Sequence, residues 1–225
     1  MITWQLLVQS ATAFSTRSAK CELDVIKITY HFMYMHIRKA ITDLTGKLLI
    51  AMPDMGDPRF EKSVILICSH SSDGAMGLIL NRAVQDIRFS DLISQLNVPV
   101  NGTVHDIPLH FGGPVEMGRG FVLHSDDYPV SNRSMRIPGG FRVTSTVDIL
   151  EAIAKGRGPE KALMTLGYSG WGPGQLEAEL QQNGWLTAEA THEVVFADDI
   201  IGKWNASLDS MGVNALHLSA TGGTA

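Results

Sequence analysis

The sequence predicts a single α+β domain, and three observations favour this class. The chain has 225 residues, of which 44% are apolar, and this is enough to enclose a core. Short apolar runs suited to strands come first, and segments with helical spacing follow them. No repeat or linker divides residues 43–225, and the elements lack the regular βαβ alternation of a doubly wound sheet.

Three strands are predicted at the start of this domain. Residues 47–52 and 63–69 are nearly continuous apolar runs joined by a turn-rich segment, as is typical of buried strands. A third strand is predicted at residues 76–81, after a turn signal at 72–74. We expect the three strands to share one sheet.

The middle of the domain combines a helix with further strands. Ser90 is the predicted N-cap of a short helix over residues 90–96. Two glycines and a proline within residues 109–114 are expected to end a strand sharply. Further strands are predicted at residues 120–124 and 140–144.

Helices are predicted to dominate the last third of the chain. Ser145 and Asp148 resemble a capping box at the start of a helix that ends near Gly156. Residues 162–166 are apolar and short, and we interpret them as a strand that leads into a glycine-rich loop. Two later helices are predicted, at residues 176–183 and 200–211.

The first 42 residues differ from the rest of the chain. They carry a net charge of +3, so the total of −5 leaves −8 for the remaining residues. They show neither strand alternation nor a capped helix, and glutamines interrupt the apolar stretch that a secretory signal would need. We expect residues 1–42 to be a poorly ordered extension, or the product of a start codon placed too early. An organelle transit peptide is the alternative, because acidic residues are scarce there.

Composition excludes several classes of protein. Cys21 and Cys68 have no CxxC spacing, so we predict neither a disulfide framework nor a zinc site, and we expect a reducing, cytoplasmic environment. No apolar run approaches the roughly 20 residues of a membrane span. The acidic domain lacks the basic surface that broad nucleic-acid binding requires. We therefore expect no membrane partner and no direct nucleic-acid binding.

A glycine-rich stretch, Gly-Tyr-Ser-Gly-Trp-Gly-Pro-Gly-Gln-Leu-Glu at residues 167–177, is the most informative motif. Phosphate-binding loops supply a cation or lead to a helix start without acids, whereas Glu177 and Glu179 follow here. We therefore predict a tight structural turn with Trp171 as a packing lid, and no nucleotide cofactor. Gln175 and Glu179 lie one helical turn apart, so both side chains are expected to face Trp171 and form a small polar pocket.

Candidate catalytic groups are few. The histidines are dispersed and lack the spacing of a helical metal pair, so no metal site is predicted. His124 and Ser125, followed by Asp126 and Asp127, supply the residue types of a catalytic triad, but their adjacency is no evidence because triads assemble across a fold. Cys68 lies in an apolar run and is interpreted as an inert core thiol. No catalytic residue is assigned.

Several ordered motifs together resemble the bacterial AlgH/YqgE family. They lie at residues 46–57, 74–81, 111–115, 120–124 and 167–177, and the match continues with Trp185 and the Lys203–Trp204 pair. The resemblance covers about residues 43–219, essentially the whole domain. It implies a mixed, bifurcated or barrel-like β-sheet surrounded by helices. For function it implies little, because some members are labelled transcriptional regulators and most are uncharacterised.

Direct DNA reading fits this chain poorly, because its predicted helices begin with acidic residues that repel phosphate. We expect any regulatory effect to act through a protein or small-molecule partner. The predicted binding groove is lined by Asn81, Gly112, Gly113, Pro114, Arg119, His124, Trp171, Gln175 and Glu179. The leading interpretation is a non-enzymatic binding or indirect regulatory protein. The alternative is a small hydrolase-like enzyme that uses the groove near Trp171.

Overall fold

The structure is a computed structural model that describes residues 43–98, 105–129, 134–213 and 218. The chain divides into two units, Met1–Asp43 and Leu44–Ala225, and every element described below lies in the second. The predicted extension at residues 1–42 lies outside the described residues.

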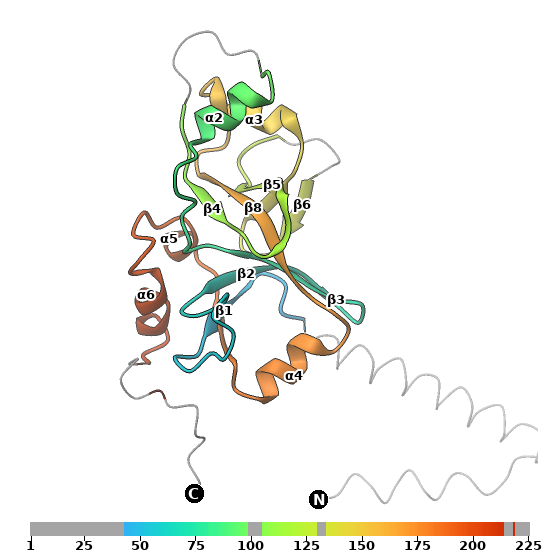
Figure 1. The fold of residues 1–225 in the computed structure, drawn as a ribbon, viewed down its shortest axis with the longest axis vertical. Coiled ribbons are helices and arrows are strands. Elements are labelled where there is room, and N and C mark those ends of the chain that lie inside the picture. The colour runs from blue at the N-terminus through green and yellow to red at the C-terminus, as the bar shows by residue number, and fades with distance from the viewer. Residues whose placement is uncertain (1–42, 99–104, 130–133, 214–217, 219–225) are drawn as a thin grey trace, which may run out of the picture. The chain divides into compact units, whose positions relative to one another are not determined.

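Nine strands of the described region form one curled sheet (Figure 1). They are β1 (Lys47–Ala51), β2 (Val64–Ser71), β3 (Gly74–Ile79), β4 (Leu109–Phe111), β5 (Val115–Ser125), β6 (Ser134–Ile137), β7 (Phe141–Thr144), β8 (Ala162–Trp171) and β9 (Trp185–Glu189). The order β6-β7-β5-β8-β3-β2-β1-β9 is antiparallel throughout, and β4 adds a parallel pair with β8. The predicted α+β fold with a mixed, barrel-like sheet is confirmed.

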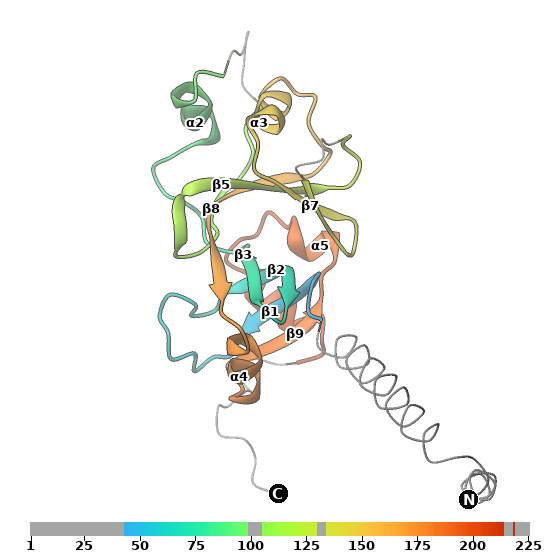
Figure 2. The same ribbon diagram turned by 90° about the vertical axis from the view of Figure 1, so that its right-hand side faces the viewer.

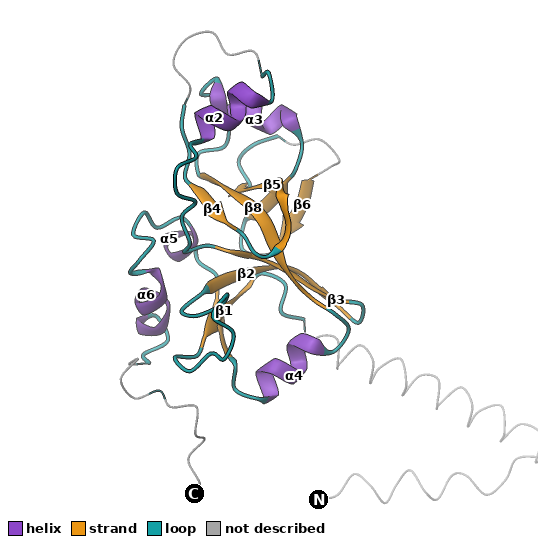
Figure 3. Ribbon diagram, viewed as in Figure 1, coloured by secondary structure: helices purple, strands orange, loops and turns teal. Residues whose placement is uncertain are grey.

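Helices cover the sheet in three places (Figures 2 and 3). The described helices are α2 (Phe89–Gln95), α3 (Val147–Ala154), α4 (Gln175–Gln181), α5 (His192–Val195) and α6 (Lys203–Asp209). Helices α2 and α3 lie together beside the half that contains β4 to β7, whereas α6 packs on β1 and β2. Helix α4 contacts β3 and β9 at the opposite end of the second unit.

Strand β8 belongs to both halves of the sheet. Its residues 162–166 pair with β5, and residues 169–171 pair with β3. Gly167 lies between these two segments with φ +71°, and a Cβ there would approach the carbonyl oxygen of Gly113 to 2.5 Å. Only glycine fits this bend. The glycine-rich stretch is therefore strand as far as Trp171, and the prediction of a turn over its whole length is wrong.

Most predicted elements are present with shifted ends, but two predicted caps are wrong. Helix α2 begins after Arg88 rather than at Ser90, because the carboxylate of Asp91 accepts the backbone N–H of Arg88 at 2.9 Å. Helix α3 begins after Thr146, and no side chain bonds its first turn. Strands β6 and β9 and helix α5 were not predicted from the sequence.

The core has three clusters. The largest lies inside the curl of the sheet and includes Leu66, Phe121 and Trp204. A second lies under α2 and α3, and a third surrounds Trp171. Cys68 is 1% exposed, and burial raises the pKa of its thiol to about 12, so its interpretation as a core thiol is confirmed. None of the described helices is long and apolar enough to cross a bilayer.

Candidate functional site

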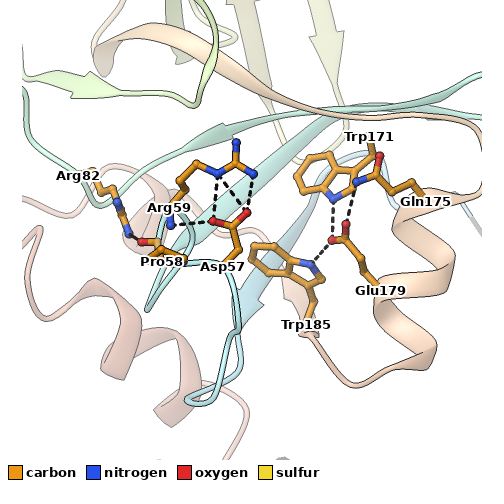
Figure 4. Close-up of polar contacts among 8 residues, drawn as sticks. All are labelled: Asp57, Pro58, Arg59, Arg82, Trp171, Gln175, Glu179 and Trp185. Atoms are coloured by element: carbon orange, nitrogen blue, oxygen red, sulfur yellow. Dashed lines mark hydrogen bonds and ion pairs between the residues drawn. The ribbon is translucent and has the colours of Figure 1, made fainter.

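Glu179 joins two tryptophans at the end of the sheet (Figure 4). Its Oε2 atom accepts the indole N–H of Trp171 at 2.9 Å and that of Trp185 at 2.8 Å. Its Oε1 atom accepts the side-chain amide of Gln175 at 2.9 Å, and Gln175 Oε1 in turn accepts the backbone N–H of Gly172 at 3.0 Å. Both carboxylate oxygens are therefore occupied, and the turn between β8 and α4 is fixed to the first turn of that helix.

Three aromatic rings pack beside this carboxylate. The rings of Trp171 and Trp185 meet edge to face with centroids 6.1 Å apart. Phe60, from the loop between β1 and β2, lies 6.5 Å from Trp171 and 5.8 Å from Trp185. Both tryptophans are buried. The aromatic cluster thus joins β8, β9 and the β1–β2 loop into one rigid floor.

A groove of about 410 Å³ lies over this floor, and we name it the tryptophan groove. Its lining includes Met52, Asp54, Met55, Asp57, Arg59, Phe60, Pro114, Trp171, Gln175, Glu179, Gln182 and Trp185. Arg59 binds Asp57 at 2.6 Å, and this hydrogen bond keeps the pKa of the Asp57 carboxyl below its usual value. Three acidic side chains and one basic side chain line the groove, so it carries a net negative charge.

A second hollow of about 630 Å³ shares Val115, Gly170 and Trp171 with the tryptophan groove. Arg119 lines this hollow and lies over the ring of Phe121 at 5.1 Å. It also pairs with Glu116 at 3.1 Å, and both of these side chains are about half exposed. The end of β8 therefore separates an acidic groove from a hollow that holds an arginine.

The structure brings part of the predicted site together. Pro114, Trp171, Gln175 and Glu179 line the tryptophan groove, and Arg119 lies in the neighbouring hollow. The two predicted glycines do not line either hollow and instead pack on the backbone of β8. A Cβ on Gly112 would approach the carbonyl oxygen of Gly167 to 2.2 Å, and one on Gly113 would meet Tyr168.

Asn81 and His124 do not line the groove, because the backbone uses their side chains. Asn81 accepts the backbone N–H of Val64 at 2.9 Å and donates to the carbonyl of Lys62 at 2.7 Å, so it ties β2 to the end of β3. His124 is buried in β5, where its ring nitrogens lie 2.8 Å from the Ser125 carbonyl and 3.0 Å from the Thr144 hydroxyl. Burial is the main reason that the pKa of His124 is lowered.

His124, Ser125 and Asp127 are not arranged as a catalytic triad. The hydroxyl of Ser125 donates to Asp127, while the His124 ring contacts Thr144 and a backbone carbonyl. A triad requires the histidine to accept the serine proton, with the carboxylate on its other nitrogen. Among the described residues, no group of three His, Cys, Asp or Glu side chains is placed to hold a metal ion.

Two residues that continue the family motif have clear structural roles. Lys203 is buried, and its ammonium donates to the carbonyls of Val194 and Val195 at 3.0 and 2.8 Å, at the C-terminus of α5. Trp204 donates its indole N–H to the carbonyl of Ala51 at 2.9 Å. Together they fix α5 and α6 to the end of β1.

The described fold and groove define a small α+β protein with a preformed, tryptophan-lined groove. A profile of the AlgH-like family matches residues 48–216, so the chain belongs to the AlgH-like family. The resemblance stated from its motifs is confirmed.

The similar proteins support this assignment. A UPF0301 protein of Cereibacter sphaeroides is 60% identical over 183 residues, which are 81% of this chain and all of that protein. A UPF0301 protein of Ruegeria pomeroyi is 56% identical over 184 residues, with the same coverage. The solution structure of AlgH from Pseudomonas aeruginosa superposes with a TM-score of 0.67 at 38% identity, covering 82% of this chain and 97% of AlgH. A Corynebacterium diphtheriae protein at 22% identity, with a TM-score of 0.61 over 74% of this chain and 86% of its own, shares the fold.

Proposed function

We propose that this protein is a non-enzymatic binding protein that receives a basic segment of a partner protein in the tryptophan groove. The observation that carries the proposal is the state of Glu179, whose two oxygens are both occupied by groups of the groove itself. A groove whose central carboxylate is already bonded has a fixed shape before any ligand arrives. Such preorganisation lowers the entropic cost of binding.

The acids of the groove are poorly suited to catalysis. A general base near neutral pH needs a raised pKa, but the hydrogen bond from Arg59 lowers the pKa of Asp57. Glu179 would have to break its bonds to two buried indoles before it could accept a proton from a substrate. These contacts favour binding over the hydrolase-like alternative.

The lining favours a basic peptide. Asp54, Asp57 and Glu179 outweigh Arg59, so a cationic ligand gains from the field of the groove. Met52 and Met55 add flexible, polarisable walls, which adapt to ligands of different shape. Tryptophans are also enriched at the hot spots of protein-binding surfaces.

We propose that any regulatory effect is indirect and takes place in the cytosol. Helices that begin with acids, such as α2 with Asp91 and α4 with Glu177, oppose the approach of DNA phosphates. The chain has only two cysteines and no CxxC spacing, which supports a reducing compartment.

The test uses two variants that add the same charge at different places. Gln182 is exposed in the groove at the end of α4, and Asn205 is exposed on α6. Peptides would be selected from a random display library on the immobilised wild-type protein, and their affinities measured by fluorescence anisotropy. We expect the selected peptides to be rich in Lys and Arg, and Gln182→Lys to weaken their binding by about five-fold or more.

The matched variant Asn205→Lys should leave these affinities unchanged. A lysine at the end of α4 also suits the helix dipole, so Gln182→Lys should fold normally. Selection of acidic or purely apolar peptides would overturn the proposal, as would equal affinities in the two variants.

A further inference from the structure

A separate cavity of about 380 Å³ lies between β4, the segment after α3 and the segment after α5. Its apolar walls include Ile107, Ile153, Leu163 and Phe196. It shares no lining residue with the tryptophan groove. A volume of this size lies within the range of small-molecule sites.

His110 lines this cavity and is only 2% exposed, yet neither of its ring nitrogens has a hydrogen-bond partner. It lies at the centre of β4, where its neighbour Leu109 packs into the cluster under α2 and α3. Because strand side chains alternate, the ring of His110 faces the opposite side. Buried polar groups are normally bonded, so this side chain lacks the partner that its position requires.

The charges around the cavity narrow the choice of that partner. Lys203 lies near enough to His110 to help burial lower the pKa of the imidazole to about 4, so the ring is neutral at pH 7. The same ammonium disfavours a cationic group beside His110, at the place where the partner of the imidazole must lie. The cavity is lined by three acidic side chains, Asp106, Glu160 and Asp198, and by one lysine, Lys161. This excess of negative charge disfavours an anionic ligand. A neutral imidazole offers one donor and one acceptor, and a hydroxyl group can complement either.

We propose that this cavity binds a small, uncharged molecule with an apolar body and a hydroxyl group that bonds to a ring nitrogen of His110. The apolar body replaces water against the isoleucine, leucine and phenylalanine walls. Both ring nitrogens are buried, so the His110 ring must turn slightly toward the cavity, where the hydroxyl supplies the hydrogen bond that the ring lacks. This site is independent of the peptide groove.

Four probes of nearly equal size test the proposal on the full-length protein. Benzyl alcohol, toluene, benzoate and benzylamine would each be titrated at pH 7, while the ring ¹⁵N resonances of His110 are followed by NMR. We expect benzyl alcohol to shift them saturably with a Kd of about 1 mM, the affinity of an efficient ligand of this size. The other three probes should bind at least about five-fold more weakly, because each loses the hydrogen bond or adds an unpaired charge.

Two substitutions extend the test. His110→Leu should abolish the binding of benzyl alcohol, whereas His110→Gln, which keeps a donor and an acceptor, should retain part of it. The chemical shifts of residues outside the cavity would report whether each variant is folded. If neither variant folds, the comparison of the four probes on the wild-type protein still tests the proposal. Shifts of the His110 ring that never saturate would mean that ordered water alone fills the cavity, and would overturn the proposal. Equal binding of toluene or stronger binding of a charged probe would also overturn it.

Discussion

Trp171 and Trp185 donate their indole N–H groups to one and the same oxygen of Glu179, at 2.9 and 2.8 Å. Trp171 ends β8 and Trp185 begins β9, so this shared acceptor joins two strands that are not neighbours in the sheet. The floor of the tryptophan groove therefore depends on one carboxylate.

Removal of that carboxylate should destabilise the fold. In Glu179→Ala two buried indole N–H groups lose their acceptor, and we expect the free energy of unfolding to fall by about 1–3 kcal/mol. Urea denaturation followed by tryptophan fluorescence measures this change. The control Gln181→Ala, at an exposed position of the same helix, should stay within about 0.5 kcal/mol of the wild type. Equal effects of the two substitutions would show that Glu179 does not hold the tryptophans.

Gly112 should tolerate no side chain. A Cβ there would lie 2.2 Å from the carbonyl oxygen of Gly167 and 2.8 Å from the Thr165 side chain, so Gly112→Ala must push β4 away from β8. We expect a loss of about 1–3 kcal/mol, measured by urea denaturation. Gly118→Ala is the control, because a Cβ at Gly118 meets nothing within 4 Å. Similar stabilities for the two variants would contradict the close packing of β4 on β8.

Lys203 should make stability depend on pH in the alkaline range. Burial lowers the pKa of its ammonium from 10.5 to about 8, so between these values the unfolded chain holds a proton that the folded protein has lost. Stability contributed by this group therefore rises with pH from about 8 to about 10.5. Urea denaturation at pH 7.5, 8.5 and 9.5 should show the wild type gaining stability relative to Lys203→Met. If the difference in free energy of unfolding between the wild type and Lys203→Met stays constant over this pH range, the prediction is wrong.

Cys68 should be unreactive in the folded protein. Its thiol is 1% exposed and burial raises its pKa to about 12, so very little thiolate forms at pH 8. In a Cys21→Ser background, labelling by an aromatic disulfide reagent should be at least about 100-fold slower in buffer than in denaturant. Rapid labelling of the native protein would exclude the core position of this residue.

The sequence predicted those elements whose signal is local. Apolar runs identified β1, β2 and β3, because a buried strand needs apolar residues on both faces. Strand β9 was missed because its five residues form neither a continuous apolar run nor a strict alternation, and because it is fixed by its pairing with β1, far away in the chain. Helix α5 has only four residues, which is too short for a periodic pattern.

In the candidate site, too, the sequence predicted local contacts and missed those that depend on distant strands. The spacing of Gln175 and Glu179 is a local property of a helix, and the structure brings both side chains to Trp171. The second tryptophan at the same carboxylate is Trp185. Its position depends on the pairing of β9, which the sequence did not predict. Asn81 and His124 were grouped with the groove by the family pattern and by the expectation that the loops meet at one end of the sheet. Neither reveals that the two side chains bond within the sheet.

The position of β8 has a consequence for the synthesis of this protein. Residues 162–166 pair with β5 and residues 169–171 with β3, so neither half of the sheet is complete until the ribosome has released most of the chain. Among the described strands β1 emerges first, and it must wait for β9 to pair with its free edge. The nascent sheet thus exposes unpaired backbone during most of translation, and we expect a requirement for chaperones at this stage.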